Sequence, residues 1–311
     1  MVKRDIKILI PQIKEKNNMI KYIAVAMTVL FTSAVSAAEI IPYGTFNYKW
    51  SHDENASGVA YDKLEDNGSK IGVEIIDMGV EGDTITGFAK LEVGVDTDDS
   101  GSDTFDSRLA YVGASTDMGD LSVGRQSHPY TDNVATRASI FNVYGGNASF
   151  SYGTRSSNSL AYSNTIGPVS IDALTVVDGS SGEDNGMDTY EWSASANILG
   201  SNVSAGFADD IVNDISYYGV SAETTLDKLT VSSSYTIKDA ATDLAAWEVA
   251  GKYNILSVGY GDKENTGTYT TVGLAKDLND SLTVYAEAEM ADNDGSAVDT
   301  QKWSIGTKFT F

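Results

Sequence analysis

Hydrophobic and polar side chains alternate along most of the chain, in short segments separated by polar turns. In 302–311, Trp303, Ile305 and Phe309 fall on one side of an extended chain, and Ser304 and Lys308 fall on the other. Successive side chains of a β-strand point to opposite faces, so this segment has one apolar face and one polar face. At about 3.3 Å per residue, a tilted strand of this length crosses the hydrocarbon of a bilayer. The pattern predicts a membrane-spanning strand.

The same two-residue rhythm recurs along the chain and predicts sixteen strands. They are 40–50, 69–77, 85–96, 106–116, 119–125, 157–165, 168–177, 188–199, 202–209, 214–226, 229–239, 245–253, 255–263, 269–276, 281–290 and 302–311. Only helices and closed barrels satisfy their backbone hydrogen bonds in lipid, and past position 37 no stretch is apolar enough for a spanning helix. The fold class expected is all-β, a 16-stranded antiparallel transmembrane β-barrel. Polar faces of its strands supply the side chains expected in the lumen: Lys90, Glu92, Tyr285, Glu287 and Glu289.

Connections between these segments alternate in length. Short turns such as 166–168 and 226–228 carry Gly, Asn or Asp, which suit tight hairpins. The other set is generally longer and more acidic, for example 51–68, 97–105 and 291–301. Short turns at one end and long loops at the other are typical of outer-membrane barrels. An even strand count places both termini at the periplasmic end and leaves no unpaired strand edge.

The connection 126–156 is much longer than the others and is therefore expected to be functional. It contains Ile140, Phe141, Val143, Phe150 and Tyr152. A solvated loop would not need so many apolar side chains, whereas a loop folded against the inner wall would. A sixteen-stranded barrel is wide enough to hold water and such a loop. We therefore expect the third long loop to fold inward.

Composition narrows the function further. The chain has 311 residues, a formal net charge of −23 and no cysteine. The acidic balance argues against a nucleic-acid partner, because phosphate binding needs clustered Lys and Arg. Residues 1–37 have the pattern of a secretory signal peptide, with Lys21, an apolar run and a small-residue cut after Ala37. Residues 1–18 precede a second possible initiator, Met19, so translation is expected to start there and not at Met1. With the signal peptide removed, 38–311 is the expected barrel domain.

Motifs for catalysis, cofactors or metals are weak. His52 and His128 each neighbour a serine, but no third catalytic group is evident, and both are expected to be loop histidines. Asp96–Asp103 resembles the opening of a calcium loop and lacks the final bidentate Glu, so a solvated acidic loop is expected. No catalytic residue, cofactor site or metal site is predicted. The expected interface-girdle aromatics are Tyr48, Trp50, Tyr111, Tyr260, Trp303, Phe309 and Phe311.

Several short motifs resemble the general bacterial porin family of Gram-negative outer membranes. They are Ala38-Glu-Ile with Tyr43-Gly44, the run 106–113, the run 119–126 leading into a loop with Gly145-Gly146, and the terminal Phe311. The resemblance covers essentially the whole mature chain. It implies a homotrimer of water-filled pores in the outer membrane, in contact with lipid and lipopolysaccharide, each pore narrowed by the third loop.

The resemblance also implies a constriction with basic residues on the wall and acids on the loop. Carried over to this sequence, the wall positions are Lys70, Arg125 and Arg155, and Tyr43 begins the first inward row. Arg125 reaches the lumen only if the strand bulges near Gly124, which glycine permits. The loop departs from the family pattern: Asn142-Val-Tyr144-Gly-Gly-Asn147 replaces an acidic motif. The constriction residues expected on the loop are Asp132, its only acid, with Arg137 and Tyr144.

The function expected is an outer-membrane porin, a non-enzymatic passive diffusion channel for small hydrophilic solutes and ions, constricted by 126–156. One alternative is a substrate-specific channel for a sugar or ion, which saturable current block would support. Another is a barrel enzyme such as a phospholipase, which loss of activity on changing His128 or His52 would support. A soluble acidic β protein is a third, and extraction by salt alone would indicate it.

Overall fold

The computed structural model describes residues 38–54, 57–77, 84–98, 104–178, 186–295 and 298–311. The chain divides into two compact units, and the second, Glu39–Phe311, contains the β-sheet. The expected signal peptide, 1–37, and the second half of the acidic run 96–103 lie outside the described residues. Within those residues no helix is long and apolar enough to cross a membrane.

The described part of the chain forms seventeen strand segments and one short π-helical turn, η2 (Thr131–Ala135). The strands are β1 (Ala38–Glu54), β2 (Ala60–Asp66), β3 (Lys70–Asp77), β4 (Ile85–Val95), β5 (Phe105–Thr116), β6 (Gly119–Ser127), β7 (Arg155–Ile166), β8 (Val169–Val176), β9 (Thr189–Ile198), β10 (Ser201–Asp210), β11 (Ile215–Leu226), β12 (Leu229–Asp239), β13 (Leu244–Tyr253), β14 (Leu256–Lys263), β15 (Gly267–Asp277), β16 (Leu282–Asn293) and β17 (Thr300–Thr310). All sixteen predicted strands coincide with one of these segments.

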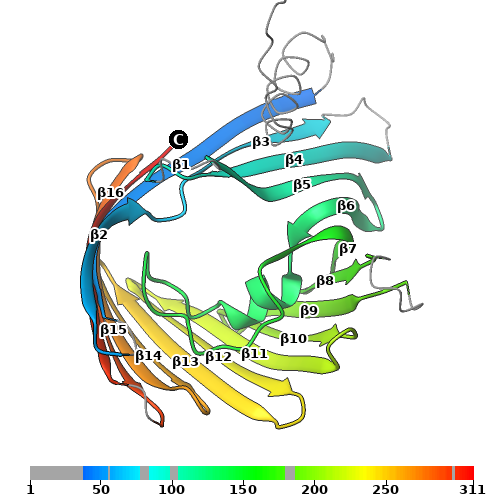
Figure 1. The fold of residues 1–311 in the computed structure, drawn as a ribbon. Coiled ribbons are helices and arrows are strands. Elements are labelled where there is room, and N and C mark those ends of the chain that lie inside the picture. Colours follow the sequence, from blue (N-terminus) through cyan, green and yellow to red (C-terminus); the bar gives the residue numbers. More distant parts are fainter. Residues whose placement is uncertain (1–37, 55–56, 78–83, 99–103, 179–185, 296–297) are drawn as a thin grey trace, which may run out of the picture. The chain divides into compact units, whose positions relative to one another are not determined.

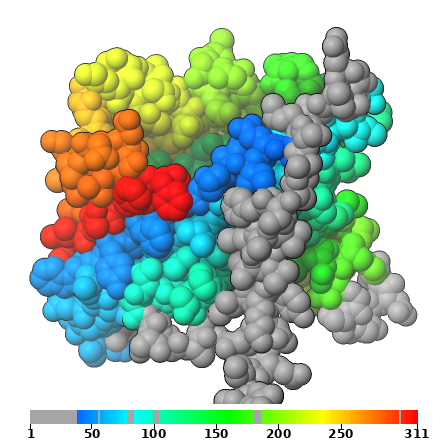
Figure 2. Space-filling model, turned by 90° about the horizontal axis from the view of Figure 1, so that it is seen from above, coloured from blue at the N-terminus to red at the C-terminus, as the bar shows by residue number. Residues whose placement is uncertain are grey.

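The sheet closes on itself because the first strand pairs with the last. β1 pairs antiparallel with β17, from Thr45 opposite Thr310 to His52 opposite Trp303, and Figures 1 and 2 show the first strand (blue) beside the last (red). β2 and β3 both pair with β1 and are two parts of one barrel strand, or stave, which is interrupted at 67–69. The result is a closed antiparallel barrel of sixteen staves, and the predicted fold class is confirmed.

Alternation sorts the side chains of each strand into an inner and an outer set. On β12, Ser232, Ser234 and Thr236 are buried inside, whereas Tyr235 is 44% exposed on the outside. Aromatic rings gather on the outer face near the loop end: Trp50 contacts Trp303 edge-on at 5.4 Å, and Trp247 lies 5.3 Å from Tyr260. An apolar outer face with aromatic belts is what lipid contact requires.

The strands extend further at the loop end than alternation predicts. The expected loop 51–68 is mostly a paired hairpin, because β1 continues to Glu54 and pairs with β2. Its side chains are largely polar, for example the Lys49–Glu65 ion pair at 3.1 Å, so no hydrophobic rhythm marks it. Backbone pairing needs no apolar side chains once a strand leaves the hydrocarbon. His52 therefore lies on β1 and stacks on Trp303, and the expectation of a loop histidine is wrong there.

The connection between β6 and β7, residues 128–154, folds along the inside of the barrel (Figure 1). We call it the inner segment. Its buried residues Tyr130, Val134, Ala135, Ala148 and Phe150 form a hydrophobic cluster with inward side chains of β10, β11, β13 and β15. The main apolar core of the barrel is thus the contact between the inner segment and the wall.

Glycines in the wall make room for the inner segment. Gly206 and Gly219 are paired neighbours on β10 and β11. A Cβ on Gly206 would lie 3.1 Å from the Tyr130 ring, and a Cβ on Gly219 would lie 2.8 Å from Val134, both closer than van der Waals contact. Gly259 on β14 leaves the corresponding space for Phe141, where a Cβ would lie 2.7 Å from the ring. At these three positions the lack of a side chain on the wall leaves room for an apolar side chain of the inner segment.

The outward position of Val220 at the middle of β11 gives a test of the barrel's orientation toward lipid. Val220→Arg places a charge in the apolar band and should reduce the free energy of unfolding in lipid by about 2–4 kcal/mol. Leu226→Arg, on the same face at the strand end, should cost less than about 1 kcal/mol. Urea unfolding in liposomes measures both, and equal losses would contradict the assigned membrane band.

Candidate functional site: the inner segment and the facing wall

Nine consecutive backbone N–H groups of the inner segment, from Asn142 to Phe150, donate to side chains of the barrel wall. Those of Asn142, Val143 and Tyr144 reach the carboxylate of Glu287 on β16 at 2.6, 2.8 and 3.1 Å. The next N–H, on Gly145, donates to Glu289 at 2.9 Å. The remaining donations go to Tyr269, Glu248 and Thr236. Wall side chains therefore take the place of a secondary-structure partner for this stretch.

The start of the inner segment is anchored by His128, which is fully buried. Its Nδ1 lies 2.6 Å from Glu191 Oε1 on β9, and its Nε2 lies 2.9 Å from Ser156 Oγ on β7. The backbone N–H of Tyr130 donates to the other oxygen of Glu191 at 3.4 Å, and the Tyr130 hydroxyl donates to the carbonyl of Tyr218 at 3.0 Å. The imidazole thus bridges two strands at the root of the segment.

The wall away from these anchors carries a cluster of cations around one buried carboxylate. Glu92 on β4 is 3% exposed. It pairs with Lys70 Nζ at 3.2 Å and Arg108 Nε at 2.5 Å, and it accepts a hydrogen bond from the Tyr43 hydroxyl at 3.1 Å. Beside it, Lys90 forms an ion pair with Glu74 and lies over the Tyr43 ring. This arrangement holds three cations in fixed positions on the inner wall.

Arg125 is brought to this wall by a local irregularity in β6. The pairing with β7 shifts between Gly124 and Gln126, which confirms the bulge predicted near Gly124. Gly124 has a φ of 135°, and a Cβ there would lie 2.2 Å from the carbonyl oxygen of Ala110, so only glycine fits. The Arg125 guanidinium donates to the carbonyl of Ser107 at 3.3 Å and to Ser157 Oγ at 3.2 Å.

Arg155, at the start of β7, lies within electrostatic range of Arg108, Arg125, Glu92 and Asp132. Asp132 belongs to η2, and its side chain is exposed where it lines a cavity. The protein around it nevertheless desolvates the carboxylate and raises its pKa, whereas a hydrogen bond from Ser127 and the charge of Arg155 act in the opposite direction. The carboxyl of the inner segment's only acid therefore titrates above the usual range of Asp. Arg137 folds back on the same turn and donates to the carbonyl of Asn133 at 3.2 Å.

The twelve predicted pore residues separate into groups. One surrounds the basic wall and comprises Tyr43, Lys70, Lys90, Glu92, Arg125, Arg155 and Asp132. A second group comprises Tyr144 of the inner segment with Glu287 and Glu289, which accept hydrogen bonds from it, and Tyr285, which is linked to it only through the Asn67 amide that donates to both the Tyr285 hydroxyl and the Asn142 carbonyl. Tyr144 is buried, with its hydroxyl donating to Asp53 at 2.9 Å, so its ring packs into the wall contact. Arg137 stays on η2 and joins neither group.

Several residues of this site were missed by the sequence reasoning. Arg108 falls on the outer face by strict alternation, but a register shift between Glu92 and Val93 turns it inward. Glu248 and Glu191 alternate inward and carry no local sign of their loop partners. His128 lies in the loop after β6, as expected, but nothing in the sequence indicated that it is buried and anchors the inner segment. Tyr111, expected in the outer girdle, faces inward and is a correction.

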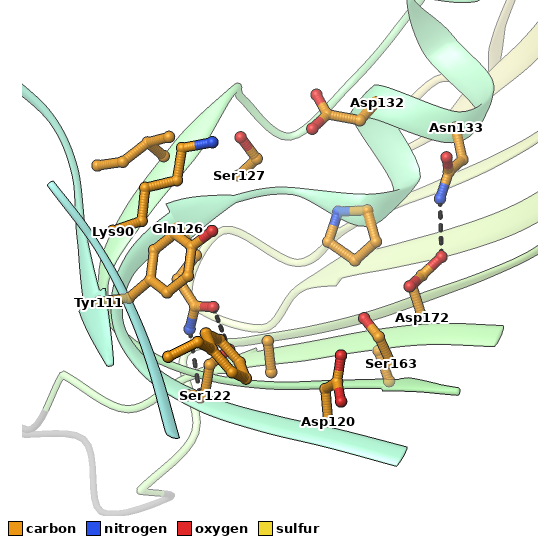
Figure 3. Close-up of a pocket in the computed structure, with 15 residues that line it drawn as sticks. Lys90, Tyr111, Asp120, Ser122, Gln126, Ser127, Asp132, Asn133, Ser163 and Asp172 are labelled. Atoms are coloured by element: carbon orange, nitrogen blue, oxygen red, sulfur yellow. Dashed lines mark hydrogen bonds between the residues drawn. The ribbon is translucent and has the colours of Figure 1, made fainter. Parts of the chain in front are cut away.

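Below the basic wall, toward the short turns, lies a cavity of about 460 Å³. Figure 3 shows side chains from β4 to β8 on one side and the root of the inner segment on the other. Its polar lining includes Lys90, Asp120, Ser122, Gln126, Ser127, Asp132, Asn133, Ser163 and Asp172, and its apolar lining includes Phe88, Leu109, Tyr111 and Pro129. Within the described residues, no group of three or more His, Asp or Glu side chains is arranged to hold a metal ion.

A closed sixteen-stave barrel with an apolar outer face, a charged inner wall and a segment docked inside defines a porin-type transmembrane barrel. The model of the Gram-negative porin family matches residues 24–306. The chain belongs to the Gram-negative porin family and is an outer-membrane porin channel. No curated protein sequence matches it.

Solved structures with the same fold include OmpT of Vibrio cholerae in its trimer form, with 20% identity and a TM-score of 0.71 over 88% of this chain and 100% of that one. An anion-selective porin from Comamonas acidovorans has 13% identity and a TM-score of 0.71, with the same coverage of both chains. Salmonella typhi OmpF in complex with daunomycin has 14% identity and a TM-score of 0.70 over 88% of this chain and 98% of that one. At these identities the likeness shows the fold.

Removing the Glu287 carboxylate tests whether wall acids fix the inner segment. Glu287→Ala leaves three backbone donors without their acceptor, and pore water replaces part of the loss, so unfolding should become easier by about 2 kcal/mol. Open-channel current noise should rise as the segment loosens. Glu223→Ala is the matched control, because Glu223 accepts a hydrogen bond from Ser232 on the wall and, within the described part of the chain, is not among the acceptors of the inner segment's N–H groups. Equal behaviour of the two variants would contradict the anchoring role.

Proposed function

We propose that this porin is a passive diffusion channel for small hydrophilic solutes and ions, narrowed where the inner segment faces the basic wall. The observation that carries the proposal is the docking of residues 142–150 across the barrel, onto β12, β13, β15 and β16. The root of the segment remains close to β7 through His128 and Ser156. The free passage is thereby assigned to the side lined by β3 to β7, where the cations lie.

The charges on that side favour anions at the narrowing. Five cations, Lys70, Lys90, Arg108, Arg125 and Arg155, face three carboxylates, Glu74, Glu92 and Asp132. Charges in a narrow passage of low dielectric constant select which ions pass. A porin of similar fold is described as anion-selective, which supports the same preference here. Solutes wider than the passage beside the inner segment are excluded by their size.

The assembly and targeting proposals follow the family. We propose a homotrimer, since a related fold has been solved in a trimer form, embedded in outer-membrane lipid and lipopolysaccharide. Residues 1–37 are proposed to be removed as a signal peptide, leaving 38–311. We also propose that the protein is not an enzyme: the Ser156–His128–Glu191 chain of hydrogen bonds anchors the inner segment, and the imidazole is buried.

Planar bilayers test the channel and its charge together. The purified protein should conduct in potassium chloride, and Arg125→Gln with Arg155→Gln should move the reversal potential toward cations in a salt gradient, because two fixed positive charges leave the passage. Lys228→Gln, in the turn between β11 and β12, is the control and should leave the potential unchanged. An insulating protein would overturn the channel, and an unmoved potential would overturn the arginines' role.

Asp132 makes the ion preference depend on pH. Partial desolvation by the surrounding protein raises its pKa, so the carboxylate becomes neutral on acidification at a pH above the ordinary Asp value of about 3.9. Neutralising an acid beside Arg155 should strengthen anion preference as the pH falls through that range. Reversal potentials measured from pH 7 to pH 3 should show this step in the unmodified protein. Asp132→Asn should already have the strengthened preference at pH 7, and a step that survives in it would have another source.

A further inference from the structure

We propose that the cavity between β4–β8 and the root of the inner segment is a binding station for a small neutral sugar, one pyranose ring at a time. The inference deepens the proposed channel function and rests on it. The cavity's volume of about 460 Å³ lies within the range of ligand sites, about 300–1,000 Å³. It combines an aromatic side with a row of hydrogen-bonding groups, which is the chemistry that a sugar ring requires.

Strand register sets the hydrogen-bonding row. Asp120 on β6 pairs with Ser163 on β7, which pairs with Asp172 on β8, and Asp172 pairs with Ser193 on β9. Residues paired in this way share a face and lie about 5 Å apart from one strand to the next. The row thus places carboxylate and hydroxyl groups alternately along one side of the cavity (Figure 3). Alternating acceptors at this spacing suit neighbouring hydroxyls of a sugar.

The aromatic side lies on the neighbouring strands β4 and β5. Phe88 and Tyr111 line the cavity with ring centroids 6.3 Å apart and nearly perpendicular. Phe88 lies against Gly113 on the paired strand, where a Cβ would come within 2.2 Å of the ring. Because Gly113 has no side chain, the edge of the Phe88 ring lies against the wall backbone there, while the ring also lines the cavity. The apolar C–H face of a pyranose can stack on such a ring.

The inner segment completes the cavity from above. Asn133 on η2 donates to Asp172 Oδ2 at 3.0 Å and to Ser193 Oγ at 2.9 Å, which ties the segment to the polar row. Asp132 and Ser127 lie at the same edge, and Lys90 enters from β4 (Figure 3). The η2 turn therefore covers the polar row and is held to it by hydrogen bonds. The lining side chains are thus fixed in position before a ligand binds.

The lining favours a neutral sugar over a simple cation. Asp172 already accepts from Asn133, and Ser127 bonds to Asp132, while Lys90 offers its own positive charge. What stays available is a mixture of acceptors on Asp120 and Asp172 with the Ser163 hydroxyl and those N–H groups of Lys90 that its ion pair with Glu74 does not use. Sugar hydroxyls both donate and accept, whereas a protonated amine can only donate. Hydrogen bonds from hydroxyls to carboxylates are charge-assisted and strong.

Current block by sugar in planar bilayers tests the proposal. D-glucose and maltose are added to the purified full-length porin in potassium chloride, and polyethylene glycol of matched size is the non-binding reference. The sugars should reduce the current saturably, whereas the polymer should act only in proportion to its concentration. Asp172→Asn and Phe88→Ala should each raise the half-blocking sugar concentration roughly ten-fold. The half-blocking concentration of each variant is read relative to that variant's own conductance without sugar.

The control is Asp277→Asn, which removes a carboxylate near the turn end of β15 from a different cavity. It should leave the half-blocking concentration unchanged. Block that does not saturate, or that both cavity variants leave unaltered, would overturn the sugar site, as would block by spermine with none by sugar. Failure of the channel itself is distinguishable, because it would appear as no conductance in salt before any sugar is added.

Discussion

The wall-to-backbone hydrogen bonds of residues 142–150 are the contact on which the interior of this porin depends. This irregular stretch inside the barrel has no neighbouring strand, and each buried N–H without an acceptor costs about 1–3 kcal/mol. Glu287, Glu289 and Glu248 supply those acceptors from β16 and β13. Carboxylates suit this role since each offers two oxygens with several lone pairs. The position of the segment is therefore set by acids on the far wall.

That arrangement explains how a strongly acidic chain can carry a basic cluster on part of its inner wall. The chain's formal charge is −23, yet its inward acids on β13 and β16 are engaged with backbone donors. On the facing wall, Glu92 is shared by Lys70 and Arg108. The guanidinium of Arg125 is held by a carbonyl and a hydroxyl instead of a carboxylate. Net charge is thus a poor guide to the field that a solute meets, because position and pairing decide it.

Alternation predicted the strands and the inward direction of Tyr285, Glu287 and Glu289. Side chains of a strand alternate between its two faces, so the apolar face toward lipid also identifies the face toward the lumen. It failed where the backbone departs from that period. The bulge opposite Glu92 turns Arg108 inward, and only family resemblance suggested the one at Gly124. The partners of Glu248 or Glu191 are about 100 and 60 residues away, and no local pattern records such contacts. The polar hairpin of β1 and β2 has no hydrophobic rhythm to reveal it.

Glycines in the wall allow the inner segment to pack closely against it. Gly206, Gly219 and Gly259 remove side chains from the wall where Tyr130, Val134 and Phe141 dock, and Gly113 does the same beneath Phe88. A wall built from alternating polar side chains would otherwise hold the inner segment several ångströms away and leave its N–H groups out of reach of the acids. Close packing and hydrogen bonding are therefore not separate contributions here. The absence of a few Cβ atoms lets the inner segment lie close enough to the wall for the carboxylates to accept its N–H groups.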